Sequence, residues 1–218
     1  MNQARQPASD MHTALPLFPL PEYTLFPNTL VPFHVYEPVY QQMLSDSVAG
    51  RRLVVVAALS EGWEADETST ETVTTGGLGR ILSDRRYPDG RVDLFVHGIA
   101  RVQITRRTTG QPWTEVDVKP IPDQIESPLD SAFHRLLVTV SQLRGTLGDE
   151  GELLGEVLAS TTEPAVLTNR LASVLVTEYG LRQTLLQTRC PAARCHQLVE
   201  TIGHQLLASD EAGGTWAN

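Results

Sequence analysis

The stretch Leu15–Tyr40, LPLFPLPEYTLFPNTLVPFHVYEPVY, decides the fold, because it combines six prolines with many large apolar residues. Proline lacks a backbone N–H donor and disfavours helical geometry in the residue before it, so no helix can run through the stretch. Its apolar side chains favour burial, which leaves short strands joined by a turn around Phe26-Pro27-Asn28. Because proline removes a ladder hydrogen bond, we expect edge or bulged strands of a small, curved sheet.

A helix and a buried strand are expected directly after this stretch. Apolar residues recur at helical spacing from Val39 to Val48, with Glu37-Pro38 and Gly50 suited to the two ends of a helix. The run Leu53–Leu59 is continuously apolar and rich in valine, which predicts a strand that is covered on both faces.

The segment 76–107 carries the clearest β pattern. Pro88-Asp89-Gly90 predicts a tight turn, because proline presets φ, aspartate bonds to the turn backbone and glycine accepts a positive φ. Apolar residues alternate with others over 92–97, as in a half-buried strand. Gly98 is expected to end that strand, with further strands over 99–105 and 113–118.

Two groups of residues occur in the order of a known family signature. The first reads L-P-L-F-P-L, then L-F-P-N, then L-V-P-F-H-V-Y-E-P, over residues 15–38. The second reads G-x-x-x-R-I from Gly76, P-D-G from Pro88 and V-x-G-x-x-R from Val96. Together they resemble the N-terminal, substrate-binding domain of Lon proteases, in the stand-alone bacterial form without ATPase or protease modules.

This resemblance implies an α+β fold, with an N-terminal PUA-like β pseudo-barrel subdomain that contains one helix and a C-terminal helical bundle. Amphipathic patterns agree with a bundle over 153–159, 163–179, 181–188 and 191–207, and Ser127-Pro128 with Asp130 resembles a capping box that opens a first helix. The expected divisions are a disordered leader (1–14), the β-rich subdomain (15–122), the helical bundle (123–208) and a disordered tail (209–218).

Composition restricts the class of partner. The chain of 218 residues has a formal net charge of -9, which disfavours nucleic acid because phosphates repel an acidic surface. No apolar run reaches the length of a membrane span, and the N-terminus lacks the pattern of a signal peptide. We therefore expect a cytoplasmic protein that binds neither nucleic acid nor membrane.

Catalytic and cofactor motifs are missing from the sequence. Lys119 is the single lysine, and it follows an expected strand rather than the glycines of a P-loop. Full Lon proteases use a serine–lysine dyad, and nothing around Lys119 matches that motif. The sequence also lacks a G-x-S-x-G nucleophile elbow and an H-E-x-x-H zinc helix. We expect no enzymatic activity and no cofactor, with Lys119 as a solvated charge.

The segment Cys190-Pro-Ala-Ala-Arg-Cys195-His196 has more than one interpretation. Cysteine and histidine are zinc ligands, and His204 is the one plausible addition to the set. A haem-attachment or redox role is a further alternative. However, Cys195 shares a helical stripe with Leu198 and Ile202, which favours a small core residue and no metal.

The resemblance implies recognition of unfolded or tagged polypeptides, or of a protease partner. An edge strand accepts an extended peptide by strand addition, and exposed aromatic rings contact apolar side chains. The candidate contacts are Phe26, Phe33, Tyr36 and Trp63, each of which also suits the core.

Two alternative functions stay open. One is a regulatory adaptor that docks on another complex. The other is a small hydrolase that uses carboxylates of the acidic 61–71 loop, namely Glu61, Glu64, Asp66, Glu67 and Glu71, which a solvated surface loop explains equally well.

Overall fold

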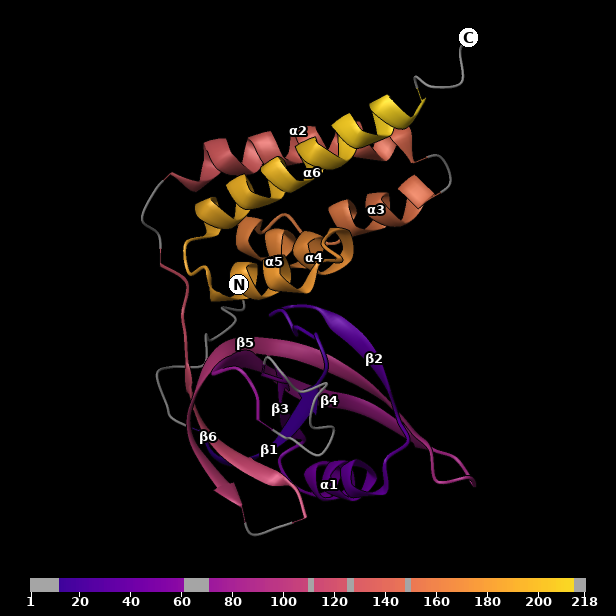
Figure 1. Cartoon of the computed structure of the whole chain (residues 1–218), viewed down its shortest axis with the longest axis vertical. Coiled ribbons are helices and arrows are strands. Elements are labelled where there is room, and N and C mark those ends of the chain that lie inside the picture. The colour runs from indigo at the N-terminus through magenta and orange to yellow at the C-terminus, as the bar shows by residue number, and fades with distance from the viewer. Residues whose placement is uncertain (1–11, 61–70, 110–111, 125–127, 148–149, 214–218) are drawn as a thin grey trace, which may run out of the picture. The chain divides into compact units, whose positions relative to one another are not determined.

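A computed structural model describes residues 12–60, 71–109, 112–124, 128–147 and 150–213 of the chain (Figure 1). The chain divides into two compact units, Met1–Pro122 and Asp123–Asn218. The first contains strands and helix α1, and the second contains helices α2 to α6, so the fold is α+β as expected. Most of the expected leader, the end of the expected tail, Trp63 and all but Glu71 of the acidic loop's carboxylates lie outside the described residues.

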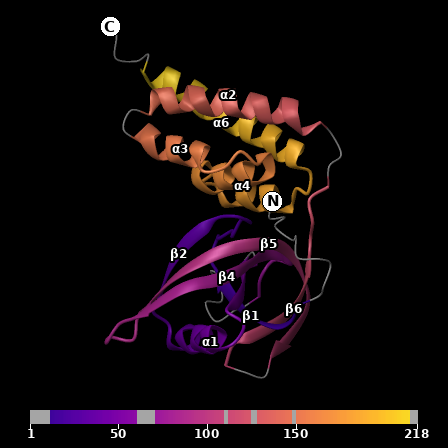
Figure 2. The same cartoon turned by 180° about the vertical axis from the view of Figure 1, so that it is seen from behind.

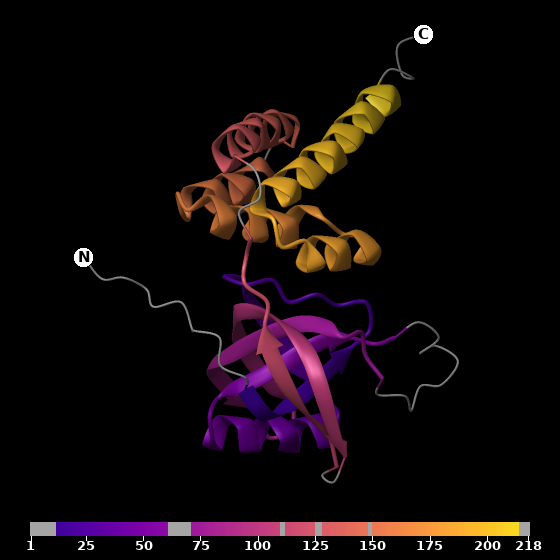
Figure 3. The same ribbon diagram turned by 90° about the vertical axis from the view of Figure 1, so that its left-hand side faces the viewer.

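The strands of the first unit form one sheet that closes on itself. Its order is β2-β5-β4-β3-β1-β6, and β5 also pairs with β6. Closure is possible because one edge of β5 pairs with β4, while its other edge pairs first with β2 and then with β6. This arrangement confirms the expected pseudo-barrel, whose strands curve around a common interior in Figure 3. The strands are β1 (His12–Leu20), β2 (Leu30–Val35), β3 (Leu53–Ala58), β4 (Thr75–Arg86), β5 (Val92–Thr109) and β6 (Thr114–Pro120).

Both proline-bearing strands occupy positions that tolerate proline. β2 stands at one end of the strand order and pairs with β5, so Pro32 lies in an edge strand. β1 pairs with β6 through its first half and with β3 through Leu17–Leu20, and its register shifts between His12 and Leu15. The prediction of edge or bulged strands is confirmed.

The β1 strand starts inside the expected leader. The Ala14 N–H donates to Asp117 Oδ1 at 3.0 Å, and Arg51 Nη2 donates to the carbonyl oxygens of Thr13 and Ala14 at 2.7 and 2.8 Å. These bonds hold residues 12–14 on the sheet. Their partners are distant in the sequence, so no local pattern indicated them.

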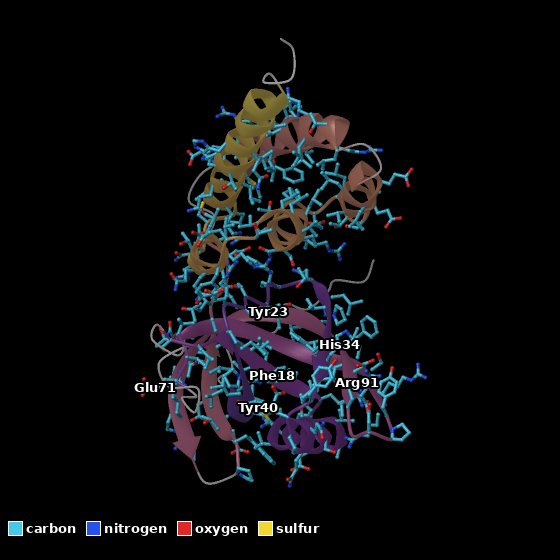
Figure 4. All side chains as sticks on the ribbon, turned by 45° about the vertical axis from the view of Figure 1, so that its right-hand side comes forward. Phe18, Tyr23, His34, Tyr40, Glu71 and Arg91 are labelled. Carbon is cyan, nitrogen blue, oxygen red and sulfur yellow. The ribbon has the colours of Figure 1, made fainter. Side chains whose placement is uncertain are left out.

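Aromatic side chains from the proline-rich stretch form the centre of one core cluster. The Phe18 ring lies edge-on to Phe33 and Tyr40, with centroids 5.8 and 5.2 Å apart (Figure 4). Helix α1 (Pro38–Ala49) covers this cluster with Met43 and Leu44. The helix begins after Glu37 and ends before Gly50, as expected.

The loop before β2 packs directly on glycine residues of β4 and β5. A Cβ atom at Gly98 would lie 2.1 Å from the Phe26 carbonyl oxygen, and one at Gly77 would lie 2.3 Å from the Leu25 carbonyl oxygen. The Gly98 N–H also donates to the Thr29 carbonyl oxygen at 2.9 Å. The two sequence blocks therefore meet here, and glycine is required because the two backbones approach closely.

The expectation that Gly98 ends a strand is wrong. β5 continues from Val92 to Thr109, with Gly98 opposite Gly79 and Ala100 opposite Leu78. The extra residue between those two pairs is accommodated by a register shift, so pairing with β4 continues past the glycine. Gly98 provides space for Phe26 rather than a break in the chain.

The second unit consists of α2 (Leu129–Thr146), α3 (Glu150–Ala159), α4 (Pro164–Leu175), α5 (Tyr179–Gln187) and α6 (Pro191–Gly213), and α2 lies beside α6 (Figure 2). The expected helix over 163–179 ends at Leu175, because Glu178 opens a new helix by accepting from the Gly180 and Leu181 N–H groups. α2 has Pro128 at its N-cap, without a side-chain hydrogen bond there, and Ser127 of the expected capping box lies outside the described residues. α6 continues to Gly213, into the expected tail.

A buried ion pair joins the start of the second unit to α6. The Arg194 side chain is 0% exposed, and its two Nη atoms donate to the Asp123 carboxylate at 2.8 and 3.0 Å. Nη1 also donates to the Thr188 carbonyl oxygen at 2.9 Å. The guanidinium therefore holds the segment before α2 against the first turn of α6.

Candidate functional site

Exposed apolar side chains gather on one side of the sheet. Among the described residues of the first unit, the large apolar side chains left exposed are Leu30, Tyr36, Leu82 and Phe95, at 57, 61, 53 and 48%. They come from β2, the residue after it, β4 and β5. Leu82 lies at the register shift of β4, where Ile81 on the opposite face is buried.

The strand register shows how these residues are arranged. Leu30, Pro32 and His34 of β2 lie opposite His97, Phe95 and Asp93 of β5, and paired residues share a face of the sheet. Phe33 and Val35 alternate with them and point into the core. We call the surface formed by Leu30, Pro32, His34, Leu82, Asp93, Phe95 and His97 the β2 face.

One end of the β2 face is polar and tightly bonded. His34 Nδ1 lies 2.7 Å from Asp93 Oδ1, and the Tyr87 hydroxyl donates to Asp93 Oδ2 at 2.8 Å. The Arg91 guanidinium lies over the Tyr87 ring at 4.2 Å, and Figure 4 shows Arg91 and His34 at the same end of the sheet. Asp93 is thus held by donors, an arrangement that orders the end of the face rather than activating a nucleophile.

Replacing Asp93 by asparagine is expected to flatten the acid limb of the stability curve. Hydrogen bonds from His34 and Tyr87 lower the pKa of the Asp93 carboxyl below its ordinary value. Such a group stabilises the fold fully above its unfolded-state pKa, and this contribution is lost as the pH falls through the folded-state pKa. Urea unfolding at a series of pH values should show a steeper loss for the wild type than for Asp93→Asn below about pH 4. Equal slopes would contradict the assignment.

The sequence-predicted contacts are not brought together on one surface. Phe26 is 0% exposed beneath its loop, and Phe33 is 8% exposed among the core rings. Tyr36 is exposed at the polar end of the β2 face, and a hydrogen bond joins its side chain to Arg91. Trp63 lies outside the described residues. Of the four, Tyr36 is the one that the structure places beside the β2 face.

Sequence reasoning missed Leu30, Leu82 and Phe95. A signal for Phe95 was present, since it occupies an outward position in the alternation of 92–97, where a polar residue is usual. Leu82 follows the buried Ile81 and so lies on the outer face by alternation, but two apolar neighbours do not show in the sequence which of them faces the core.

The two cysteines belong to the core of the second unit. Cys190 is 8% and Cys195 is 0% exposed, and neither forms a disulfide. Cys195 Sγ lies 3.3 Å from Thr168 Oγ1, and burial raises the pKa of the Cys195 thiol, which favours the protonated form. The core interpretation of Cys195 is confirmed. Over the described ranges, no group of three or more histidine, cysteine, aspartate or glutamate side chains is arranged to hold a metal ion.

A cavity of about 210 Å³ lies on another side of the first unit, between α1 and the β1–β6 pair. Trp113, Asp46, Glu115 and Arg51 are among its lining residues. The Arg51 guanidinium donates to the backbone of β1, so this lining residue holds the strand in place. In the part of the chain that the structure describes, no helix is long and apolar enough to cross a bilayer.

Comparison with known sequences gives one consistent result. A family model described as the ATP-dependent protease La (LON) substrate-binding domain matches residues 14–204. The chain is 27% identical to a Lon protease of Roseiflexus castenholzii over 202 residues, which are 90% of this chain and 25% of that protein. A Lon protease of Trichlorobacter lovleyi is 21% identical over 200 residues, 89% of this chain and 24% of that protein. The chain therefore spans about a quarter of the length of these relatives.

Solved structures show the same fold. The N-terminal domain of Mycobacterium avium complex Lon protease matches with a TM-score of 0.68 at 16% identity. A Lon N-terminal domain protein from Xanthomonas campestris matches with a TM-score of 0.63 at 24% identity. Each match covers 87% of this chain and 98% of the other.

Proposed function

Because the chain belongs to the family of the ATP-dependent protease La (LON) substrate-binding domain, we propose that it is a non-catalytic module that binds unfolded or tagged polypeptides. The observation that carries this proposal is the β2 face, where Leu30, Leu82 and Phe95 are exposed around an edge strand. Contiguous exposed apolar side chains favour interaction with another polypeptide, since covering them removes apolar surface from water. Tyr36 adds an amphipathic ring at one end.

The size of the face sets the expected affinity. Covering one large apolar side chain completely contributes about 1.5–3 kcal/mol, and these side chains are already about half covered. Four such contacts supply at most about 6 kcal/mol before the cost of ordering an unfolded chain, which corresponds to weak binding, closer to millimolar than to micromolar Kd. An interaction of this strength suits a module that releases what it binds.

Replacing Leu30 and Phe95 by serine is expected to weaken binding of a permanently unfolded, carboxymethylated protein by about tenfold or more. The two side chains are exposed in the folded domain, so their loss removes contact area for a ligand without opening the core. Fluorescence anisotropy with the labelled unfolded protein measures the change in Kd.

Leu153→Ser is the matched control, because Leu153 is a 60% exposed leucine on α3 of the second unit. It should leave the Kd unchanged. If the wild-type protein does not bind the unfolded protein at all, or if Leu153→Ser weakens binding as much as the double variant, the β2 face is not the binding surface.

A regulatory adaptor differs from this module in its partner rather than in its chemistry. The same face would then contact a folded complex such as an ATP-dependent protease. Co-purification of the wild type beside the Leu30→Ser/Phe95→Ser variant separates the two cases, since an adaptor retains a stoichiometric folded partner that the variant loses.

A further inference from the structure

The outer edge of β2 carries backbone groups that point away from β5. The Gly98 N–H donates to the Thr29 carbonyl oxygen, and hydrogen-bonded and non-bonded pairs alternate along an antiparallel ladder. Thr29 therefore bonds to β5 through its carbonyl oxygen, and Val31, Phe33 and Val35 bond to it through both N–H and C=O groups. The groups of Leu30, Pro32 and His34 face the opposite side, which explains why Pro32 interrupts no ladder bond.

This outer edge is open within the described residues. Backbone hydrogen bonds from the other elements and loops leave the N–H and C=O groups of Leu30 and His34 and the carbonyl oxygen of Pro32 unbonded. Two donors and three acceptors are thus presented in a row, at the spacing that an added strand requires. The apolar side chains of Leu30 and Pro32, with Phe95 behind them, lie along the same row.

Two exposed arginines of β4 lie on the same face as this row, with β5 between β4 and β2. Arg80 lies opposite His97 and Arg85 opposite Asp93 on the outward side of β4, and both arginines are exposed. Neither forms an ion pair among the described residues, whereas Asp93 already accepts from Tyr87 and contacts His34, and Asp84 pairs with Arg52 at 3.1 Å. Neighbouring strands are about 4.8 Å apart, so the β4 backbone lies about 10 Å from that of β2, and the long arginine side chains bring their charge nearer to the edge.

We propose that an extended, apolar and acidic polypeptide segment adds as a strand to the outer edge of β2. This inference rests on the proposed function and specifies how the ligand is held. The ligand's backbone pairs with Leu30, Pro32 and His34. Its side chains at every second position share the face of Leu30, Pro32 and Phe95, where apolar ones cover these residues. A carboxylate at one of the same alternate positions lies on the face of Arg80 and Arg85. The domain would then select ligands by their extended conformation, by the alternation of their side chains and by their charge, and not by one particular sequence.

The test uses the full chain and a seven-residue peptide with leucine at positions 2 and 4, glutamate at position 6 and threonine elsewhere, so that leucine and glutamate share one face. Two derivatives carry N-methyl groups, one at the even and one at the odd positions. Because only alternate amides of an added strand face β2, one derivative should lose at least about tenfold in affinity while the other retains binding. A version with lysine in place of glutamate should bind several-fold more weakly at about 0.15 M salt, where charges more than about 8 Å away are screened, and the difference should shrink at about 1 M.

A pair of protein variants tests the same edge from the other side. His34→Pro removes the outward N–H, whereas His34→Ala keeps it, and both lose the imidazole. His34→Pro should bind the peptide about tenfold more weakly than His34→Ala. The thermal midpoints of both variants show whether they fold, and the N-methyl comparison on the wild type holds even if one does not.

The outcomes separate this inference from the proposed function. Equal effects of the two N-methyl patterns, with the unmodified peptide and unfolded protein still bound, would overturn strand addition and leave the binding module in place. No binding of either ligand would overturn both. Self-association that His34→Pro abolishes, without peptide binding, would make the occupant of the edge a second copy of this chain and overturn the proposed ligand.

Discussion

Replacing Gly98 by alanine is expected to destabilise the first unit by about 3 kcal/mol, a large part of the unfolding free energy of a domain. The added methyl group would lie 2.1 Å from the Phe26 carbonyl oxygen. That oxygen belongs to backbone rather than to a flexible side chain, and the same loop is held by the hydrogen bond from Gly98 to Thr29. Urea unfolding, followed by far-ultraviolet circular dichroism, measures the loss.

Gly203→Ala in α6 is the matched control. A methyl group at Gly203 would meet no atom from outside its own helical turn within 4 Å, and alanine is the better helix former by about 1 kcal/mol. This control should be neutral or stabilising. A Gly98→Ala protein that is as stable as the wild type would mean that the loop relaxes away from β5, and the close approach would lose its structural importance.

Replacing Asp123 by alanine is expected to destabilise the second unit by about 3 kcal/mol, the low end for breaking a buried ion pair, because the Asp123 side chain is 33% exposed. The Arg194 guanidinium is 0% exposed, and without the carboxylate it remains buried with its charge uncompensated. Hydrogen exchange of the α6 amides, in the regime that reports unfolding free energy, measures the effect.

Glu156→Gln changes the same charge at an exposed position of α3 and should alter exchange by less than about 0.5 kcal/mol. If Asp123→Ala matches this control, the guanidinium is stabilised sufficiently by the carbonyl oxygen of Thr188. The ion pair would then form as a result of folding without contributing to the stability of the second unit.

Local patterns predicted most elements of the first unit. The prolines indicated a bulged β1 and an edge β2, and Glu37-Pro38 and Gly50 indicated both ends of α1. Each of these signals acts within a few residues of the element that it describes. Gly98 was misread because its role depends on Phe26, which is distant in sequence, and a glycine that makes room looks the same in a sequence as one that ends a strand.

The candidate site was less predictable for the same reason. Aromatic residues were the obvious candidates, yet Phe26 and Phe33 are buried because their loop and strand close the core. Which apolar residues remain outside depends on strand register, and register is a long-range property. The ion pair of Asp123 with Arg194 could not be predicted either, because nothing around Arg194 in the sequence indicates a partner 71 residues earlier.

The position of β5 between three neighbours has a consequence for how the chain folds. β2 is complete by Val35, but its partner begins at Val92, and the β6 segment that pairs with the first half of β1 begins at Thr114. During synthesis, β1 and β2 therefore remain without these partners until β5 and β6 have been made. The sheet cannot form by successive addition of hairpins. Such non-local pairing is slow because the entropy of closing a long loop is lost before the strand contacts contribute any free energy. Until β5 emerges, β2 has both edges open, so the newborn chain itself presents the kind of extended apolar segment that its mature form is proposed to bind.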